Sequence, residues 1–204
     1  MYHGERFNSF THLAGTALSI AGSAMLITRA SEQGDPWKLI AFTAFGIGLV
    51  LLYAASTLYH SFRGPAKSVL RKLDHVAIYL LITATYAPFL LVSLRGPFGW
   101  TLFAVVWAMA LYGIWQACRR NDGSDPSPWP YMAMGWLGVA AFVPLVDKLG
   151  AVGLGWLAAG GLMYTAGVLF YVNDRRWRHA HGIWHLFVMG GSASHYVAVF
   201  YFVS

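Results

Sequence analysis

The chain has 204 residues, of which 57% are hydrophobic and only 11% are charged, and its formal net charge is +6. Water-soluble globular domains carry about 25% charged residues, and here the charges cluster between long apolar stretches. This composition excludes a soluble fold, and with it a partner role for nucleic acid, despite the positive charge. The single cysteine, Cys118, excludes an internal disulfide and a cluster of thiolate metal ligands.

Seven apolar segments follow one another along the chain, each long enough to cross a bilayer as a helix. They predict an all-α integral membrane protein in which residues 1–204 form a single seven-helix domain. Turn-forming and charged residues separate the segments, for example at Gly34-Asp35-Pro36 and Arg95-Gly96-Pro97. The predicted helices span residues 8–28, 37–61, 72–94, 98–118, 130–147, 152–172 and 180–203.

The distribution of Lys and Arg predicts the direction of these helices, because cytoplasmic loops of membrane proteins are enriched in basic residues. The N-terminus and the loops after the second, fourth and sixth segments hold ten of the 14 basic residues. We therefore expect a cytoplasmic N-terminus and a C-terminus outside. The ten residues are Arg6, Arg63, Lys67, Arg71, Lys72, Arg119, Arg120, Arg175, Arg176 and Arg178.

Ionisable side chains inside membrane helices are costly and usually functional. Asp74, just inside the third predicted segment, is the one acidic residue that lies neither in a loop nor at a segment end. Six histidines also lie inside the segments: His12, His60, His75, His181, His185 and His195. With the predicted topology, Asp74 and five of the histidines share one depth near the cytoplasmic ends of four helices. His195 differs, because it follows His185 by ten residues, which is about 15 Å along a helix.

The spacing of His181 and His185 places both imidazoles on one helical face, where they can bind one metal ion. His60, at matching depth on another helix, is the natural third ligand. Three protein ligands and one open position are typical of catalytic zinc, which lowers the pKa of bound water to about 7. Asp74 could act as a base towards that water or bind the metal directly. Ser56, one turn before His60, could hydrogen-bond the water or a substrate carbonyl group.

Other polar residues near this depth have less specific interpretations. His12, His75 and Glu5 could surround the metal ligands. A lone histidine in a membrane helix is more often a packing residue, which is the interpretation we favour for His12 and His195. Bis-histidine haem is another chemistry, but its axial ligands approach from opposite faces, so two histidines on one helical face could not both bind one haem.

Several motifs give the chain a resemblance, over nearly its whole length, to the hemolysin III family. This family is the bacterial branch of the progestin and adipoQ receptor (PAQR) family. The motifs are ERFNSFTH at residues 5–12, STLYH at 56–60, RKLDH at 71–75, HGIWH at 181–185 and the following HY at 195–196.

The resemblance implies a seven-helix protein of the bacterial inner (cytoplasmic) membrane with its N-terminus inside. It also implies zinc (Zn2+) held by His60, His181 and His185, with Asp74 contacting zinc-bound water and Ser56 nearby. Finally, it implies kinship with the alkaline ceramidases, in a superfamily of proposed membrane hydrolases.

These observations leave three functions open. The first is a zinc-dependent hydrolase of a lipid amide or ester, for which no second acid for the leaving group is evident. The second is a non-enzymatic membrane sensor or regulator of lipid homeostasis with a structural zinc. The third is a cytolysin, which we rank last because a pore needs a polar stripe and the outer halves of the segments are mostly apolar. Membrane lipids are the expected substrate or ligand, and the sequence does not identify any protein partner.

Overall fold

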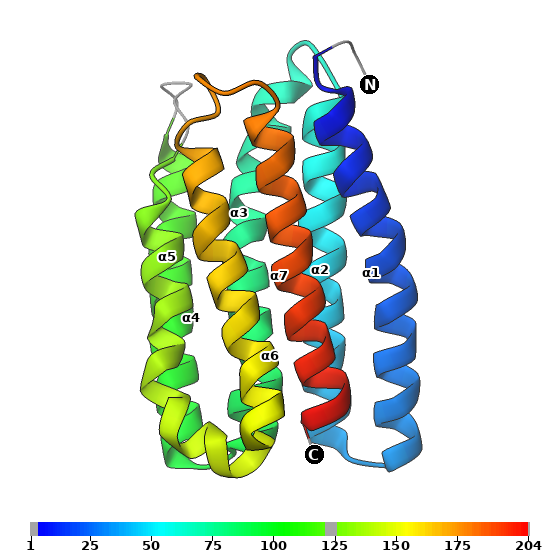
Figure 1. The fold of residues 1–204 in the computed structure, drawn as a ribbon, viewed down its shortest axis with the longest axis vertical. Coiled ribbons are helices and arrows are strands. Elements are labelled where there is room, and N and C mark those ends of the chain that lie inside the picture. The colour runs from blue at the N-terminus through cyan, green and yellow to red at the C-terminus, as the bar shows by residue number, and fades with distance from the viewer. Residues whose placement is uncertain (1–3, 121–125, 204) are drawn as a thin grey trace.

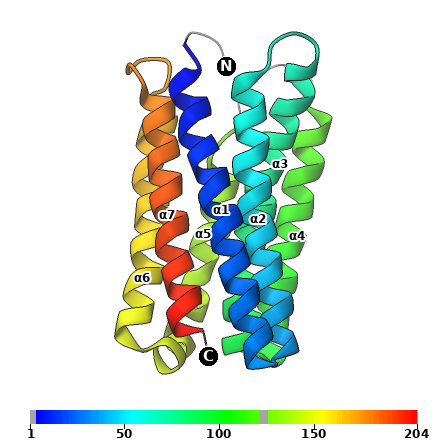
Figure 2. The same ribbon diagram turned by 90° about the vertical axis from the view of Figure 1, so that its right-hand side faces the viewer.

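The computed structural model describes residues 4–120 and 126–203, and every regular element within them is helical. The all-α prediction is therefore confirmed for these residues, while part of the predicted loop between 118 and 130 lies outside them. Figures 1 and 2 show long helices running side by side along one axis. The elements are α1 (Arg6–Gln33), α2 (Pro36–Ser61), α3 (Ala66–Ala87), η1 (Pro88–Ser93), α4 (Pro97–Arg119), α5 (Trp129–Trp136), η2 (Leu137–Ala141), α6 (Phe142–Tyr171) and α7 (Ala180–Phe202).

The third apolar segment differs from its prediction at both ends. Helix α3 begins at Ala66, before the predicted residue 72, and follows Pro65, a residue type that suits a helix start. At its other end Pro88 has no N–H group to donate to the preceding turn. The chain continues there as the π-helix η1, in which the Leu94 N–H donates to the Phe89 carbonyl over 2.9 Å.

The predicted boundary between residues 147 and 152 coincides with a break inside α6. Gly150 has a φ of 66° and a ψ of 174° there, and glycine adopts positive φ without steric cost. Figure 1 shows the chain running from α5 to the foot of the bundle and back up along the rest of α6. Two antiparallel helical stretches therefore lie between residues 129 and 171.

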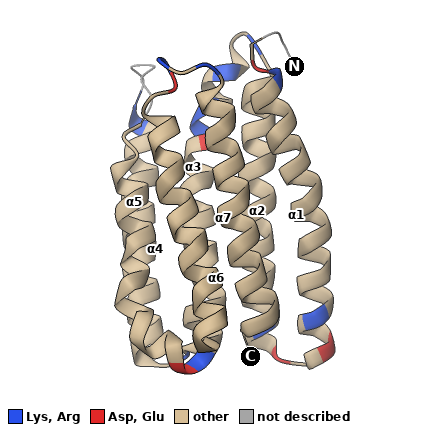
Figure 3. Cartoon of the chain, in the orientation of Figure 1, with Lys and Arg blue, Asp and Glu red and all other residues tan. Residues whose placement is uncertain are grey.

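The described helices have the apolar character of membrane spans. Five stretches are long and apolar enough to cross a bilayer, and α7 is not among them. In Figure 3 the charged residues lie at the two ends of the bundle, with an uncharged middle. This pattern indicates an integral membrane protein. The five stretches are Arg6–Gln33, Pro36–Ser61, Ala66–Ser93, Pro97–Arg119 and Trp129–Tyr171.

The packing of α1, α2 and α7 determines where their polar residues meet. Helix α1 packs along α2 and also contacts α7, and Figure 2 shows the three as neighbours. Polar contacts reinforce this arrangement, because the Tyr53 hydroxyl of α2 donates to Ser192 Oγ of α7 over 2.7 Å. The Tyr196 hydroxyl of α7 donates to the Gly22 carbonyl of α1 over 3.0 Å. The start of α1, the end of α2 and the start of α7 thereby meet at one end of the bundle.

Candidate metal centre

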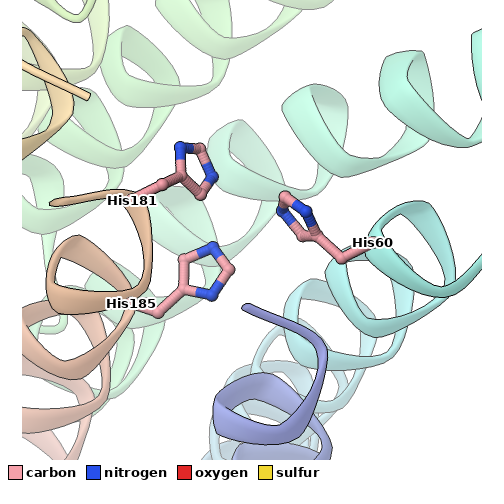
Figure 4. A group of neighbouring side chains, drawn as sticks. All are labelled: His60, His181 and His185. Atoms are coloured by element: carbon pink, nitrogen blue, oxygen red, sulfur yellow. The ribbon is translucent and has the colours of Figure 1, made fainter. Parts of the chain in front are cut away.

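Three histidine rings face one another at this end of the bundle. His60 lies in the last turn of α2, and His181 and His185 lie in the first turns of α7. Each offers one ring nitrogen, and these nitrogens all lie within 4.8 Å of one another. The ring centroids are 4.9 to 5.0 Å apart, so the rings form a nearly equilateral triangle. Figure 4 shows the rings converging from the two helices, and together they could hold one metal ion.

Each ring in this triangle has its Nδ1 atom near an oxygen atom outside it. Carboxylate and carbonyl oxygens accept hydrogen bonds but do not donate them, so in each neutral ring Nδ1 carries the proton. The unprotonated Nε2 is then the atom available to a metal ion. The pairs are His60 with Glu5 (2.7 Å), His181 with Asp174 (3.4 Å) and His185 with the main-chain carbonyl of Asn8 (3.1 Å).

The burial of the triangle also fits a metal ion. His60 and His185 are 3% and 1% exposed. Within the described residues the Nε2 atom of His60 is buried and has no hydrogen-bond partner. Leaving such an atom unsatisfied costs about 1–3 kcal/mol, and coordination would satisfy it. Imidazole ligands suit zinc, copper, iron and nickel, so the donor set fits a transition metal without selecting one.

Two carboxylates flank the triangle and carry negative charge at neutral pH. Burial raises the pKa of Glu5, but the hydrogen bond and charge of His60, a hydrogen bond from Asn8 and the charge of Lys67 outweigh burial and lower the pKa to about 2. The hydrogen bond from His181 lowers the pKa of Asp174 below its usual value. The surroundings of the three histidines therefore favour a cation.

His12 lies against the triangle without joining it. Its ring stacks on that of His185, with centroids 3.6 Å apart and planes 14° apart, and meets the ring of Tyr53 edge-on. Both of its nitrogens are buried without a hydrogen-bond partner among the described residues. The face of the His12 ring, rather than a nitrogen, therefore meets His185.

A cavity of about 640 Å³ opens beside the histidines, within the range of about 300–1,000 Å³ that small-molecule sites occupy. His181, His185, Ser56 and Asp74 line it, whereas His60 contacts the other two rings from outside the lining. Ser56 is buried and Asp74 is half-buried. Most of the remaining wall is apolar and comes from α3, η1, α5, α6 and α7, including Ile78, Leu81, Phe89, Leu145, Leu154 and Val188.

The other histidines singled out from the sequence line the same cavity but have different surroundings. His75 is half-buried, and its carbonyl oxygen accepts a hydrogen bond of 3.4 Å from the Tyr131 hydroxyl. His195 Nε2 lies 3.0 Å from the carbonyl oxygen of Leu157 on α6. Neither ring belongs to the group of nitrogens that could share an ion among the described residues.

The structure adds contact residues that sequence reasoning did not single out. Asn8 and Thr11 both approach His185 Nδ1 at 3.1 Å, and Asp174 approaches His181. The spacing of Glu5, Asn8 and His12 places them on one helical face, which could have indicated a joint role. Asp174 lies in a turn before α7, where helical spacing gives no signal.

Comparison with known proteins identifies a family whose match covers most of the chain. The sequence profile of the family described as "Haemolysin-III related" matches residues 1–196. The chain belongs to this family. It is 42% identical to "Hemolysin-3" of Bacillus cereus, in an alignment that covers 98% of this chain and 91% of the relative. It is 41% identical to the "Hemolysin-3 homolog" of Bacillus subtilis (strain 168), with 97% and 93% covered.

The family extends beyond bacteria. The chain is 34% identical to the human "Monocyte to macrophage differentiation factor" over 94% of this chain and 81% of that protein. The resemblance to the hemolysin III and PAQR proteins predicted from the motifs is thus confirmed.

Proposed function

We propose that this haemolysin-III-related protein is a zinc-dependent hydrolase that acts on a lipid amide or ester near the cytoplasmic face of the bacterial inner membrane. One observation carries the proposal: a triangle of histidines with available Nε2 atoms lies at a cavity with mostly apolar walls. An apolar cavity inside a membrane bundle suits an acyl chain, and a metal ion beside it suits hydrolysis of the bond at the end of that chain.

The proposed topology has seven crossings with the N-terminus in the cytoplasm. It is supported by the reversal at Gly150, which divides the stretch from Trp129 to Tyr171 into two antiparallel halves. With α7 as a further crossing, the number becomes seven. The start of α1 and the end of α7 lie at opposite ends of the bundle in Figure 1, as an odd number of crossings requires.

In this mechanism His60, His181 and His185 would hold the zinc ion through Nε2. When bound, zinc supplies Lewis-acid activation of a water molecule and of the substrate carbonyl group. Asp74, on the cavity wall, would accept the proton of the attacking water as general base. It would then pass this proton to the leaving amine or alcohol as the amide or ester bond breaks. Ser56, also on the wall, donates a hydrogen bond to the substrate carbonyl. The apolar wall holds the acyl chain and keeps bulk water away from the reacting bond.

The substitution Asp74→Asn tests this function, because asparagine keeps the size and hydrogen-bonding capacity of aspartate but cannot act as a base. We expect zinc content and thermal stability to remain near wild type. Turnover should fall about 10²–10⁴-fold, the usual contribution of a general base. The measurement is hydrolysis of a broad panel of lipid amides and esters by purified protein, with zinc counted in parallel. Loss of zinc from the variant would instead make Asp74 a direct ligand and remove its role as base.

A sensor or regulator with a structural zinc is the second candidate. It is supported by the near-complete burial of His60 and His185, because an ion there would clamp α2 to α7. This candidate predicts no turnover in fully zinc-loaded wild-type protein on any substrate of the panel. A water-filled pore has less support, since the middle of the described bundle is uncharged in Figure 3.

A further inference from the structure

We propose that the first two turns of α1, residues 5–12, form a support that fixes two of the three metal ligands, with Glu5 as the principal positioning residue. Helix α1 supplies none of the histidines of the triangle. The inference rests on the proposed metal site, and it assigns a role in that site to α1, which supplies no metal ligand. It concerns how His60 and His185 are oriented before an ion binds.

Glu5 is held between the metal ligand and two other groups. Its Oε2 atom accepts hydrogen bonds from His60 Nδ1 at 2.7 Å and from Asn8 Nδ2 at 2.8 Å. Its Oε1 atom lies 3.6 Å from the ammonium group of Lys67. A carboxylate fixed in this way keeps the His60 ring in one plane and its proton on Nδ1. It also makes Nε2 a more basic ligand, as carboxylate–histidine pairs do in metal sites.

The position of Glu5 in α1 supports this role over a purely local one. Glu5 occupies the N-cap position, where a carboxylate commonly accepts hydrogen bonds from the first helical N–H groups. Its side chain makes no such capping hydrogen bond. The carboxylate reaches instead to a histidine 55 residues further along the chain. The contact therefore serves the packing of α1 on α2 at the metal site and not the start of the helix.

His185 is fixed by the next turn of the same helix. Its Nδ1 atom lies 3.1 Å from both the Asn8 carbonyl oxygen and Thr11 Oγ1. The Thr11 hydroxyl donates to main-chain carbonyls of its own helix, so its oxygen is free to accept the His185 proton. His12 stacks on the ring of His185 at 3.6 Å. The contacts of Nδ1 thus fix the direction in which the ring edge points, and stacking of His12 on the ring face limits tilting of the ring.

The support has a thermodynamic consequence that a packing role lacks. If Glu5 and the turn behind it stabilise the metal-binding arrangement, bound zinc must in return stabilise residues 5–12 by the same free energy. Zinc should therefore slow amide hydrogen exchange in this segment. His181 is supported differently, by Asp174 at 3.4 Å, so the effect at α1 should depend on Glu5 in particular.

The test compares Glu5→Ala and Glu5→Gln in full-length protein purified in detergent. Zinc affinity is measured by competition with a chelator. We expect Glu5→Ala to raise the Kd for zinc about 10–100-fold, the usual effect of losing an outer hydrogen bond to a metal ligand. Glu5→Gln keeps an acceptor oxygen but loses the charge, so its loss should be smaller. Glu32→Ala is the matched control, because Glu32 is an exposed acidic residue at the other end of α1, and its Kd should stay close to wild type.

Hydrogen exchange separates positioning from simple destabilisation. In wild-type protein zinc should slow exchange in residues 5–12, and in Glu5→Ala this dependence on zinc should largely disappear. An unchanged Kd in Glu5→Ala, with exchange faster to the same extent with and without zinc, would overturn the inference and leave a packing role. Failure of wild-type protein to bind zinc would overturn the metal proposal itself and this inference with it. The two failures are thus distinguishable.

Discussion

At the scale of single residues, the surroundings of each ring nitrogen distinguish a metal ligand from a packing histidine. His60 keeps a buried Nε2 atom without a partner among the described residues, at the point where the other two rings converge. His195 uses its Nε2 atom in a contact of 3.0 Å with a main-chain carbonyl. His12 presents a ring face to its neighbour. Residues of one type in one bundle therefore have separate chemical roles.

Removing one histidine at a time should reveal these roles. Purified wild-type protein should contain about one zinc per chain, as expected for three ligands with an open position. We expect His185→Ala to lose most of this zinc, and His181→Ala and His60→Ala likewise, because each change removes one of three ligands. His195→Ala is the control and should retain its zinc.

The measurement is zinc content by elemental analysis, after dialysis against the same weak chelator for every variant. Circular dichroism should accompany it, so that a misfolded variant is not taken for a metal-free one. If His195→Ala lost its metal as completely as His185→Ala, the triangle would be the wrong site.

At the scale of helices, the sequence was sufficient for the positions of most elements. Apolar length, Gly-Pro signals and charges predicted the ends of α2, α4 and α7 within a few residues. Such local signals suffice because a membrane helix forms all its backbone hydrogen bonds within its own segment. The sequence was not sufficient for η1 and η2. Their hydrogen-bond patterns depend on how neighbouring helices accommodate an irregular turn, which local spacing does not encode.

The same limit applies to the candidate site. The His181–His185 spacing and the matching depth of His60 singled out three rings that the structure brings together. The hydrogen-bond partners of those rings come from a different helix or from a turn. Their identity depends on the angle and rotation of α1 against α2 and α7. A single sequence contains no direct record of those angles. The sequence could therefore indicate Glu5 as a residue near the metal ligands, but not that it contacts His60.

Close packing of α6 on α7 leads to a prediction at this scale. A Cβ atom at Gly160 would overlap the edge of the His195 ring and lie 3.0 Å from the Gly191 carbonyl, whereas one at Gly161 would meet nothing within 4 Å. We expect Gly160→Ala to destabilise the protein by about 1–3 kcal/mol, as overpacking usually does. Gly161→Ala should be neutral or slightly stabilising, since alanine favours helix over glycine.

Thermal unfolding of the two variants in the same detergent tests this contrast between adjacent positions. The midpoint should fall for Gly160→Ala only, with zinc content unchanged in both. Equal midpoints for the two variants would mean that α6 and α7 are not packed as closely as the structure places them.

At the scale of the whole molecule, the direction of insertion determines where the candidate site can act. The charged residues lie at the two ends of the bundle, and the end that holds the start of α1 is rich in Lys and Arg (Figure 3). The histidine triangle lies at this end, since His60 is in the last turn of α2 and His181 is in the first turn of α7. If the N-terminus is cytoplasmic, as we propose, the candidate metal centre lies near the cytoplasmic leaflet and the cavity extends from it into the membrane.

Reporter fusions test this arrangement directly. A reporter that is active only outside the cytoplasmic membrane should work when fused at the C-terminus and fail when inserted between residues 119 and 128. A reporter active only in the cytoplasm should give the opposite result at both positions. The expectation follows from the ten basic residues on one set of ends against four on the other, because basic loops stay in the cytoplasm. A cytoplasmic C-terminus would require an even number of crossings if the N-terminus is inside. The two halves around Gly150 could then not both cross the membrane. With seven crossings, a cytoplasmic C-terminus would instead place the N-terminus outside, and substrate would have to reach the histidines from the outer leaflet.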